Sequence, residues 1–324
     1  MKTLPQPFLL LLSTLLPAAS AFQLGPLLST CIDACQKGCD EIRQCYLDQE
    51  GDGSVVVVER KDANDPRSVL TLADQAAQAA ILGSLRQEWG SELNVVGEED
   101  ETATGDSTSD RTFASLCRTY LEDDLGDETP DIDPSRITIF VDPLDGTREF
   151  VEGRLENCQV LVGIAIDGEA VAGSIGIPFP GGSEGTSISP TIVYGLADFG
   201  TGVMGSPLTR GPVPLEKHID GIKFPRPHHA TGDNPVPVVS SCVDTVIRKF
   251  GGSNVVYGGA GNKILAAALG EVACSIQHKV GGPWDLCAPE AIIKAMGGGF
   301  SDLFGEPIDM YRPDSPRNAN ERGF

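Results

Sequence analysis

The sequence is short of basic residues. Lys and Arg number 24 against 46 Asp and Glu, so this 324-residue chain has a formal net charge of −22. The deficit of positive charge excludes a large basic face of the kind that binds a nucleic-acid backbone. It does not exclude a small anionic ligand, because metal ions or helix ends can supply positive charge locally.

Internal repeats and low-complexity tracts are also lacking. Gly and Pro number 38 and 23, below the roughly 25–30% of a chain that indicates low complexity. Collagen-like and wholly disordered chains are therefore excluded. With 40% hydrophobic and 22% charged residues, the composition is typical of a soluble globular protein. The length predicts two domains or one large one.

Long apolar runs are lacking outside the N-terminus. There, Lys2 precedes an apolar stretch at 8–16 that is too short to span a bilayer, and Ala19-Ser20-Ala21 is a small-residue cleavage site. We expect residues 1–21 to be a signal peptide for the secretory pathway, with no membrane association after its removal. An uncleaved anchor is one alternative. A second alternative is delivery to the plastid of an alga with a secondary plastid, because Phe22 directly follows the predicted cleavage site.

Zinc-type cysteine motifs are missing, although the chain has nine cysteines. Cys31, Cys35 and Cys39 are four residues apart in a predicted helix, and Cys45 follows them. Residues four apart stack on one helix face, so this spacing favours a packing stripe of small side chains. A redox or disulfide role is the alternative, which the secretory route would permit. A zinc site is disfavoured because no Cys-x-x-Cys and no neighbouring His accompany the cluster.

Hydrophobic periodicity predicts an α+β first half and an α/β second half, which together give a mixed α/β protein. The Asp167-Gly168 pair is typical of a hairpin turn between two strands. Residues 178–237 are rich in Gly and Pro, and strands then alternate with helices. The predicted helices are 27–46, 65–87, 262–269 and 289–296, and the predicted strands of the first half are 93–96, 137–141, 160–166 and 170–177. The predicted divisions are 22–178, 179–312 and a disordered tail at 313–324.

Acidic residues concentrate between the predicted strands 93–96 and 137–141. Residues 98–133 contain thirteen acids, with Arg111 and Arg118 as the only bases, and so carry half of the net charge. Residues 100–135 have no apolar period and are rich in Ser, Thr and Gly. We expect a loop there.

The segment Asp142-Pro143-Leu144-Asp145-Gly146-Thr147 carries the clearest chemical signal. Its two carboxylates follow a hydrophobic strand, Pro143 fixes the backbone and Gly146 permits a tight turn, so both carboxylates can converge. Converging carboxylates repel unless a cation is present, and oxygen ligands favour Mg²⁺. The helix start that follows can direct backbone N–H groups at an anion. An Asp-Pro turn with an Asp helix cap is the alternative.

Two further acidic sites accompany this segment. Glu98 and Glu99 follow a predicted strand, and Asp285 precedes a helix with Pro289 expected in its first turn. Taken alone, Glu98 and Glu99 would indicate a solvated turn, and Asp285 a helix N-cap. Together the three sites favour a metal centre.

The chain resembles the lithium-sensitive, magnesium-dependent phosphatases of the inositol monophosphatase superfamily. The resemblance rests on three motifs in the same order and spacing, and it extends from about residue 27 to 310. The continuation Thr147-Arg148-Glu149-Phe150 and the segment 258–263 look most like the 3′(2′),5′-bisphosphate nucleotidases. The three motifs are Gly97-Glu98-Glu99, residues 142–147 and Trp284-Asp285-Leu286-Cys287-Ala288-Pro289.

The resemblance implies a layered αβαβα sandwich with the site between the two halves of the chain, and two to three Mg²⁺ ions. Asp74 and Thr147 would accept the proton of the attacking water. Glu99 would support the ligands without touching metal. The implied metal ligands are Glu98, Asp142, Asp145, Asp285 and the carbonyl of Leu144, and the implied substrate contacts are Gly146, Thr147 and Lys263.

The expected reaction is removal of the 3′-phosphate of adenosine 3′,5′-bisphosphate to give AMP, with phosphoadenylyl sulfate as a further substrate. One departure from the nucleotidases is Ser240-Ser241-Cys242, where they often place a phosphate-binding His. The alternatives are an inositol mono- or polyphosphate phosphatase and a non-catalytic relative that only binds metal or ligand. Intact candidate residues disfavour the last. The expected partner is a small phosphate ester, not nucleic acid or a membrane, and the sequence leaves the oligomeric state open.

Overall fold

The computed structural model describes residues 22–49, 57–60, 69–91, 93–99, 131–205, 236–240, 252–255, 257–278, 281–315 and 322–324. The predicted signal peptide, most of the predicted acidic loop and Ser241-Cys242 lie outside these ranges. Within them, every helix is too short or too polar to cross a membrane.

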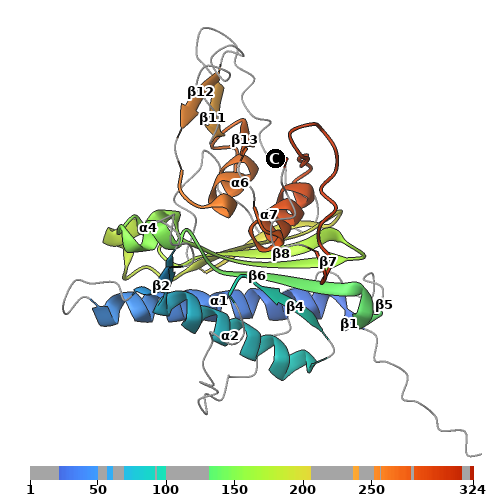
Figure 1. The fold of residues 1–324 in the computed structure, drawn as a ribbon, viewed down its shortest axis with the longest axis horizontal. Coiled ribbons are helices and arrows are strands. Elements are labelled where there is room, and N and C mark those ends of the chain that lie inside the picture. Colours follow the sequence, from blue (N-terminus) through green and yellow to red (C-terminus); the bar gives the residue numbers. More distant parts are fainter. Residues whose placement is uncertain are drawn as a thin grey trace, which may run out of the picture.

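A six-stranded sheet runs through the middle of the molecule (Figure 1). Its strand order is β10-β9-β8-β7-β6-β4, and its neighbouring strands are antiparallel except for the parallel pair β4 and β6. Every residue of β6 is buried, as expected for a central strand covered on both faces. The strands are β4 (Asn94–Gly97), β6 (Ile137–Asp145), β7 (Gln159–Ile166), β8 (Glu169–Ile177), β9 (Thr191–Leu196) and β10 (Gly200–Gly205).

The predicted hairpin is confirmed. β7 and β8 pair with Ile166 opposite Glu169, and the two turn residues Asp167 and Gly168 have φ of 55° and 94°. Positive φ at both positions matches the twist of the flanking strands. The same sheet also includes β9 and β10, which lie beyond the predicted division at residue 178. The division of the chain into two halves stays a prediction.

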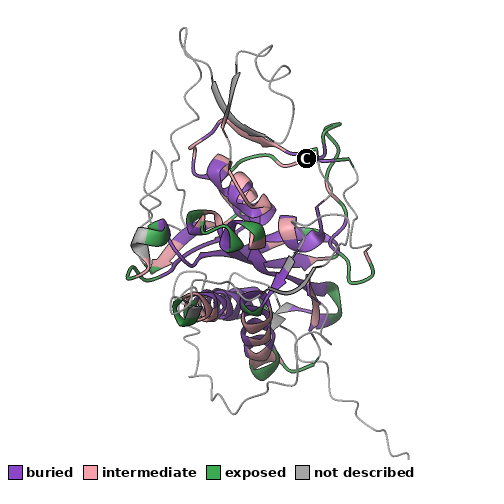
Figure 2. Cartoon of the chain, turned by 60° about the vertical axis from the view of Figure 1, so that its left-hand side comes forward, coloured by how far each residue is buried: buried purple, intermediate pink, exposed green. Residues whose placement is uncertain are grey.

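Helices α1 (Leu24–Gln49) and α2 (Leu72–Trp89) cover one face of the sheet with their buried sides (Figures 1 and 2). Cys31, Cys35 and Cys39 are free thiols on α1 and are fully buried. A Cβ placed on Gly176 of β8 would lie 2.4 Å from Cys39 Sγ and 2.9 Å from Cys35 Sγ. The stripe therefore packs the helix closely onto the sheet, as the packing interpretation predicts.

α2 begins later than the predicted helix 65–87. Residues Val69–Thr71 form a short strand, β3, that pairs with β2 (Val57–Arg60). Thr71 caps the helix, since its backbone N–H donates to Asp74 Oδ2 at 2.8 Å and its hydroxyl lies 3.4 Å from the Asp74 N–H. Helical periodicity alone did not locate this cap.

Helices α6 (Ala260–Ala268) and α7 (Pro283–Ala295) cover the other face. α7 begins at Pro283 and not near 289, because Pro283 is the proline of its first turn. Pro289 lies inside the helix, which corrects the predicted start. Beyond α6 lies a parallel sheet of order β12-β11-β13, which completes a layered α/β arrangement and confirms the predicted fold class. Its strands are β11 (Val236–Ser240), β12 (Gly252–Val255) and β13 (Cys274–Ile276).

Short elements complete the described chain. α4 follows β6 directly, and β1 pairs with β5 at the edge of the molecule. Three 3₁₀ segments lie between the longer elements. These elements are β1 (Phe22–Gln23), β5 (Asp131–Ile132), α4 (Thr147–Val151), and the 3₁₀ segments Pro134–Arg136, Leu155–Asn157 and Gly182–Gly185.

Part of the predicted disordered tail is folded. Phe324 exchanges two backbone hydrogen bonds with Gln277, of 2.6 and 2.7 Å. The Phe324 ring is 6% exposed and lies 5.5 Å from the ring of Phe300, centroid to centroid. Arg322 also pairs with the buried carboxylate of Asp302 at 2.7 Å. The low apolar content of this tail concealed these contacts.

Candidate active site

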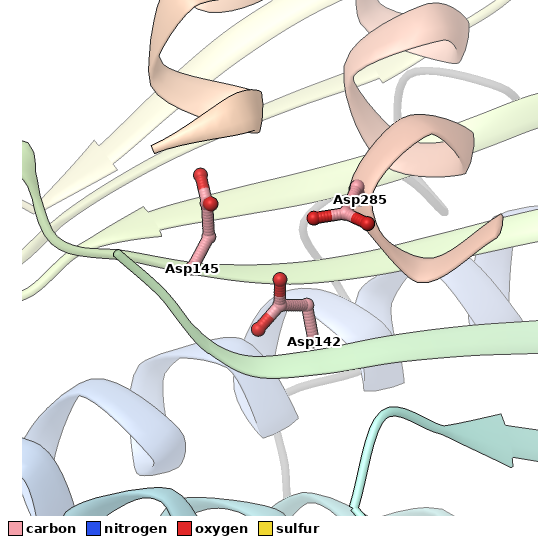
Figure 3. A group of neighbouring side chains, drawn as sticks. All are labelled: Asp142, Asp145 and Asp285. Carbon is pink, nitrogen blue, oxygen red and sulfur yellow. The ribbon is translucent and has the colours of Figure 1, made fainter. Parts of the chain in front are cut away.

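Three carboxylates from distant parts of the chain converge between the sheet and α7. Asp142 and Asp145 lie on β6 and Asp285 on α7, and their side chains point toward one another (Figure 3). Each offers a ligand oxygen, and these oxygens lie within 4.8 Å of one another. Asp142 and Asp145 are 2% and 5% exposed, and Asp285 is half-buried. The structure thus brings together three of the predicted ligands.

A bulge in β6 directs both of its carboxylates to the same place. β6 does not end at Val141 as predicted but continues to Asp145, and its pairing with β7 shifts between Asp142 and Asp145. Residues three apart on a regular strand would face opposite sides, so the extra residue restores a common side. Pro143 lies in the bulge, where its missing N–H breaks no ladder. Asp142 Oδ1 accepts the Leu144 N–H at 3.0 Å, which fixes that carboxylate.

The N-terminus of α6 holds the carboxylate of Asp145. Asp145 Oδ1 accepts the Ala260 N–H at 2.8 Å, and Oδ2 accepts the N–H groups of Gly261 at 2.8 Å and Asn262 at 3.4 Å. Burial raises the pKa of Asp145, while these N–H groups and the charge of Lys263 oppose that rise. The helix therefore favours the ionised carboxylate, the form that binds a cation.

Asp285 is fixed in the first turn of α7. Its Oδ2 accepts the backbone N–H of Gly282 at 2.6 Å. The N-cap of α7 is Gly282, whereas Asp285 taken alone indicated an N-cap at 285. Asp285 is instead the third residue of the helix, and its side chain bonds to the N-cap backbone. This bond fixes the direction of the Asp285 carboxylate.

The donor set fits a hard divalent cation. Three carboxylates held this close, two of them buried, repel one another unless a positive charge lies among them. Carboxylate oxygens are the ligands that Mg²⁺ prefers. The Leu144 carbonyl oxygen lies 3.0 Å from the Thr147 hydroxyl oxygen and has two lone pairs, one of which a ligand can use. The residues present therefore fit the metal that the sequence predicts.

Asp74 and Thr147 meet beside this cluster. The Thr147 hydroxyl lies 2.9 Å from Asp74 Oδ1, and Asp74 Oδ2 accepts the Thr71 N–H at 2.8 Å and the Thr71 hydroxyl at 2.5 Å. Asp74 is fully buried. The carboxylate is therefore held on one side by its own helix cap and presents its other oxygen to Thr147.

Glu98 and Glu99 follow β4 at the same end of the sheet. The Glu98 N–H donates to the Val141 carbonyl at 2.9 Å, next to Asp142. Among the described residues, the group within 4.8 Å is Asp142, Asp145 and Asp285, and Glu98 is not part of it. Glu99 is buried at 6% exposure. Because β4 and β6 are parallel and Gly97 lies opposite Val141, Glu98 and Glu99 leave β4 at the level where Asp142 follows Val141.

Gln78 is a site residue that sequence reasoning missed. It is fully buried on α2, and its side-chain amide pairs with the Glu99 backbone in both directions, at 2.8 and 3.1 Å. Gln78 therefore holds the segment that contains Glu98 and Glu99 against helix α2. The available signal was a polar side chain four residues after Asp74 on an Ala-rich helix face.

The predicted substrate contacts lie around the same centre. Gly146 has φ of 88°, and a Cβ there would lie 2.9 Å from the Asn157 carbonyl, so the turn requires glycine. Lys263 lies on α6 with its Nζ 3.4 Å from Gln277 Oε1, and its charge acts on Asp145. Ser240 ends β11, while its neighbours at 241 and 242 lie outside the described residues.

Comparisons with known proteins show the family of this chain. Residues 26–322 match the inositol monophosphatase family. The 3′(2′),5′-bisphosphate nucleotidase 1 of Homo sapiens is 32% identical over 278 residues, which cover 83% of this chain and 81% of that protein. A Golgi-resident adenosine 3′,5′-bisphosphate 3′-phosphatase of Rattus norvegicus is 29% identical over 188 residues, covering 55% and 45% of the two chains.

A solved structure shares the fold. Inositol monophosphatase II of Staphylococcus aureus superposes with a TM-score of 0.53 at 19% identity, covering 86% of this chain and 84% of the other. The comparisons define a phosphatase with a layered α/β fold. The chain belongs to the inositol monophosphatase family.

Proposed function

We propose that this protein is a Mg²⁺-dependent phosphomonoesterase that hydrolyses the 3′-phosphate of adenosine 3′,5′-bisphosphate to give AMP and phosphate. The observation that carries the proposal is the convergence of Asp142, Asp145 and Asp285 beside the Asp74–Thr147 pair. The similarity to a bisphosphate nucleotidase over most of both chains supports the substrate.

The family is magnesium-dependent in general, and two to three Mg²⁺ ions are proposed here. Asp142, Asp145 and Asp285 would hold them, with Glu98 and the Leu144 carbonyl as further ligands. When bound, the metal would neutralise phosphate charge and lower the pKa of a bound water. The α6 N–H groups favour the ionised form of the Asp145 carboxylate and orient it for this role.

Thr147 and Asp74 supply the proton path. The Thr147 hydroxyl donates to Asp74 Oδ1 at 2.9 Å, so its lone pairs can accept a hydrogen bond from the attacking water. That bond orients the water for in-line attack on phosphorus, and the water proton passes toward the Thr147 and Asp74 pair. The two hydrogen bonds from Thr71 hold Asp74 in place during the transfer.

Substrate choice depends on a second phosphate. Members of the family act on small phosphate esters. Lys263, one helical turn into α6, would contact the 5′-phosphate of the nucleotide, while Gly146 and Thr147 approach the phosphate that leaves. An inositol mono- or polyphosphate is the alternative substrate, since a solved relative is an inositol monophosphatase. Phosphoadenylyl sulfate carries the same 3′-phosphate and is a proposed further substrate.

A panel of phosphate-release assays tests the proposal. The substrates are adenosine 3′,5′-bisphosphate, inositol 1,4-bisphosphate and inositol monophosphate, each with and without Mg²⁺ and Li⁺. We expect turnover of the nucleotide to require Mg²⁺ and to fall with Li⁺, as is typical of the family. Faster turnover of an inositol phosphate would move the assignment to the alternative. Mg²⁺ binding without any turnover would favour the non-catalytic relative.

The proposed compartment is the secretory pathway. The support is the sequence of residues 1–21 together with a Golgi-resident relative. Imaging the full chain with a C-terminal fluorescent tag, beside a variant lacking residues 1–21, tests it. Lumenal signal that is lost in the variant agrees with the proposal, and plastid signal would support the alternative.

A further inference from the structure

Asn262 is the centre of a buried hydrogen-bond network beside Asp145. It lies in the first turn of α6 and is 1% exposed. Its side-chain nitrogen donates to Asn157 Oδ1 at 2.9 Å and to the Gly258 carbonyl at 3.1 Å. Its side-chain oxygen accepts from Gln159 Nε2 at 3.2 Å. One amide therefore joins residues 157–159 to the start of α6.

These segments are the ones that place Asp145. Gln159 is the partner of Asp145 in the pairing of β6 with β7, and Asn157 ends the 3₁₀ segment just before β7. The N–H groups that bind the Asp145 carboxylate belong to Ala260, Gly261 and Asn262. The network thus ties the start of α6 to the strand pair that carries Asp145.

A second contact fixes the loop that leads into α6. Arg154 donates two hydrogen bonds to Glu149, of 2.5 and 3.0 Å. A Cβ on Gly258 would lie 2.3 Å from Glu149 Cδ, so the Glu149 side chain rests directly on that backbone. Gly259 follows with φ of 74°, and a Cβ there would lie 2.7 Å from Asp145 Oδ2. The start of α6 is therefore closely packed as well as hydrogen-bonded.

We propose that Asn262 is a positioning residue for the metal site, holding the α6 N–H groups on Asp145 and thereby fixing the direction of that carboxylate for a divalent cation. The inference rests on the proposed metal site. An apolar side chain of similar size would leave Asn157 and Gln159 without these bonds in a buried place, and the start of α6 would shift. Asp145 would then lose its partners and bind a cation less tightly.

Mg²⁺ titration calorimetry on the purified chain, without substrate, tests this role. We expect Asn262→Leu to weaken Mg²⁺ binding, with a Kd about tenfold higher than that of the wild type, as is typical when a group behind a metal ligand is removed. Asn157→Ala, which removes one partner without altering α6, should weaken it by a smaller factor. Asn94→Leu is the matched control, because Asn94 makes a comparable bond to the Ile137 carbonyl at the other end of β6. Its Mg²⁺ affinity should equal that of the wild type.

A kinetic measurement separates positioning from general stability. In Asn262→Leu the Mg²⁺ concentration for half-maximal rate should rise by about tenfold, while KM for the nucleotide at saturating Mg²⁺ changes little. Wild-type Mg²⁺ affinity in Asn262→Leu, with a Tm equal to that of Asn94→Leu, overturns the inference. If Asn262→Leu does not fold, the Asn157→Ala titration decides.

The proposed function and this inference fail in different ways. A wild-type chain that binds Mg²⁺ but releases no phosphate contradicts the proposed function, and calorimetry still tests Asn262. A wild-type chain that binds no Mg²⁺ overturns both.

Discussion

The Thr147 hydroxyl and the Asp74 carboxylate lie 2.9 Å apart, although 73 positions of sequence separate them. Asp74 lies in the first turn of helix α2, and Thr147 starts α4 at the end of β6. A single carboxylate therefore bonds to the N-cap residue of one helix, Thr71, and to the residue that begins another, Thr147. This pairing gives a direct test of the proposed proton path.

Variants of Thr147 should distinguish the catalytic effect of its hydroxyl from an effect on the fold. Thr147→Val keeps the shape and removes the proton donor, so we expect kcat for phosphate release to fall by about 10²–10⁴, with a small change in KM. Thr147→Ser keeps the hydroxyl and should retain most of the activity. Steady-state kinetics at saturating Mg²⁺ measures both. Equal losses in Val and Ser variants would contradict a role for the hydroxyl.

Asp142→Asn should reduce activity and increase the stability of the metal-free chain. Removing one of three convergent carboxylates relieves their repulsion, so Tm without Mg²⁺ should rise above that of the wild type. The increase in Tm on adding Mg²⁺ should shrink, because that increase reflects binding to the native state. Phosphate release should fall by more than about 100-fold. Thermal melts with and without Mg²⁺ check the first two results, and a variant with unchanged turnover would contradict the ligand assignment.

Gly176→Ala should destabilise the fold without touching the site. The added methyl would meet Cys39 Sγ at 2.4 Å and Cys35 Sγ at 2.9 Å. Overpacking of this kind costs about 1–3 kcal/mol of unfolding free energy. Urea denaturation measures the loss. The double variant with Cys39→Ala should recover part of it, because it restores the space, and a double variant no more stable than the single one would contradict close packing of the stripe.

Glu290 should make stability depend on pH. It is buried on α7, its carboxylate pairs with Lys294, and it accepts the Tyr311 hydroxyl at 2.5 Å. Burial raises the pKa of Glu290 above its usual value of 4.5, against the opposing effects of Lys294 and Tyr311. The folded chain then holds this proton more tightly than the unfolded chain, so the contribution of Glu290 is most favourable below that value and declines as pH rises toward the raised pKa.

The matching variant is Glu290→Gln, which cannot titrate. The unfolding free energy of the wild type minus that of Glu290→Gln should decrease as pH rises from about 4.5, by at most about 1.4 kcal/mol per pH unit. Denaturant melts of both proteins between about pH 4.5 and 7.5 measure the difference. A difference that stays constant over this range would show that the carboxyl does not titrate with a raised pKa.

Local patterns predicted much of the fold. The hairpin at Asp167-Gly168 was correct because its turn chemistry lies in two adjacent residues. The cysteine stripe followed from helical spacing, and the Asp142 and Asp145 pair from a short run containing Pro143 and Gly146. In each case the deciding interaction acts within a few residues.

Other features depended on contacts that spacing does not show. Gln78 was missed because its partner, the Glu99 backbone, lies 21 positions away. The early start of α7 was missed because Pro283 and Pro289 both look like first-turn prolines, and only the Asp285 bond to Gly282 decides between them. The start of helix α2 was predicted too early because residues 69–71 pair with Val57–Arg60, which lies outside the periodic stretch. Asn262 was noted only as part of the segment 258–263, because its contacts join that segment to residues 157–159, which meet it only after folding.

The parallel pairing of β4 with β6 has a consequence for how this family can vary. Gly97 and Val141 are register partners, and Asp131–Ile132 is anchored by pairing with Phe22–Gln23. Both ends of the acidic stretch are therefore attached to the scaffold independently of what lies between them. We therefore expect that a reporter sequence grafted between residues 99 and 131 leaves the three carboxylates in their places.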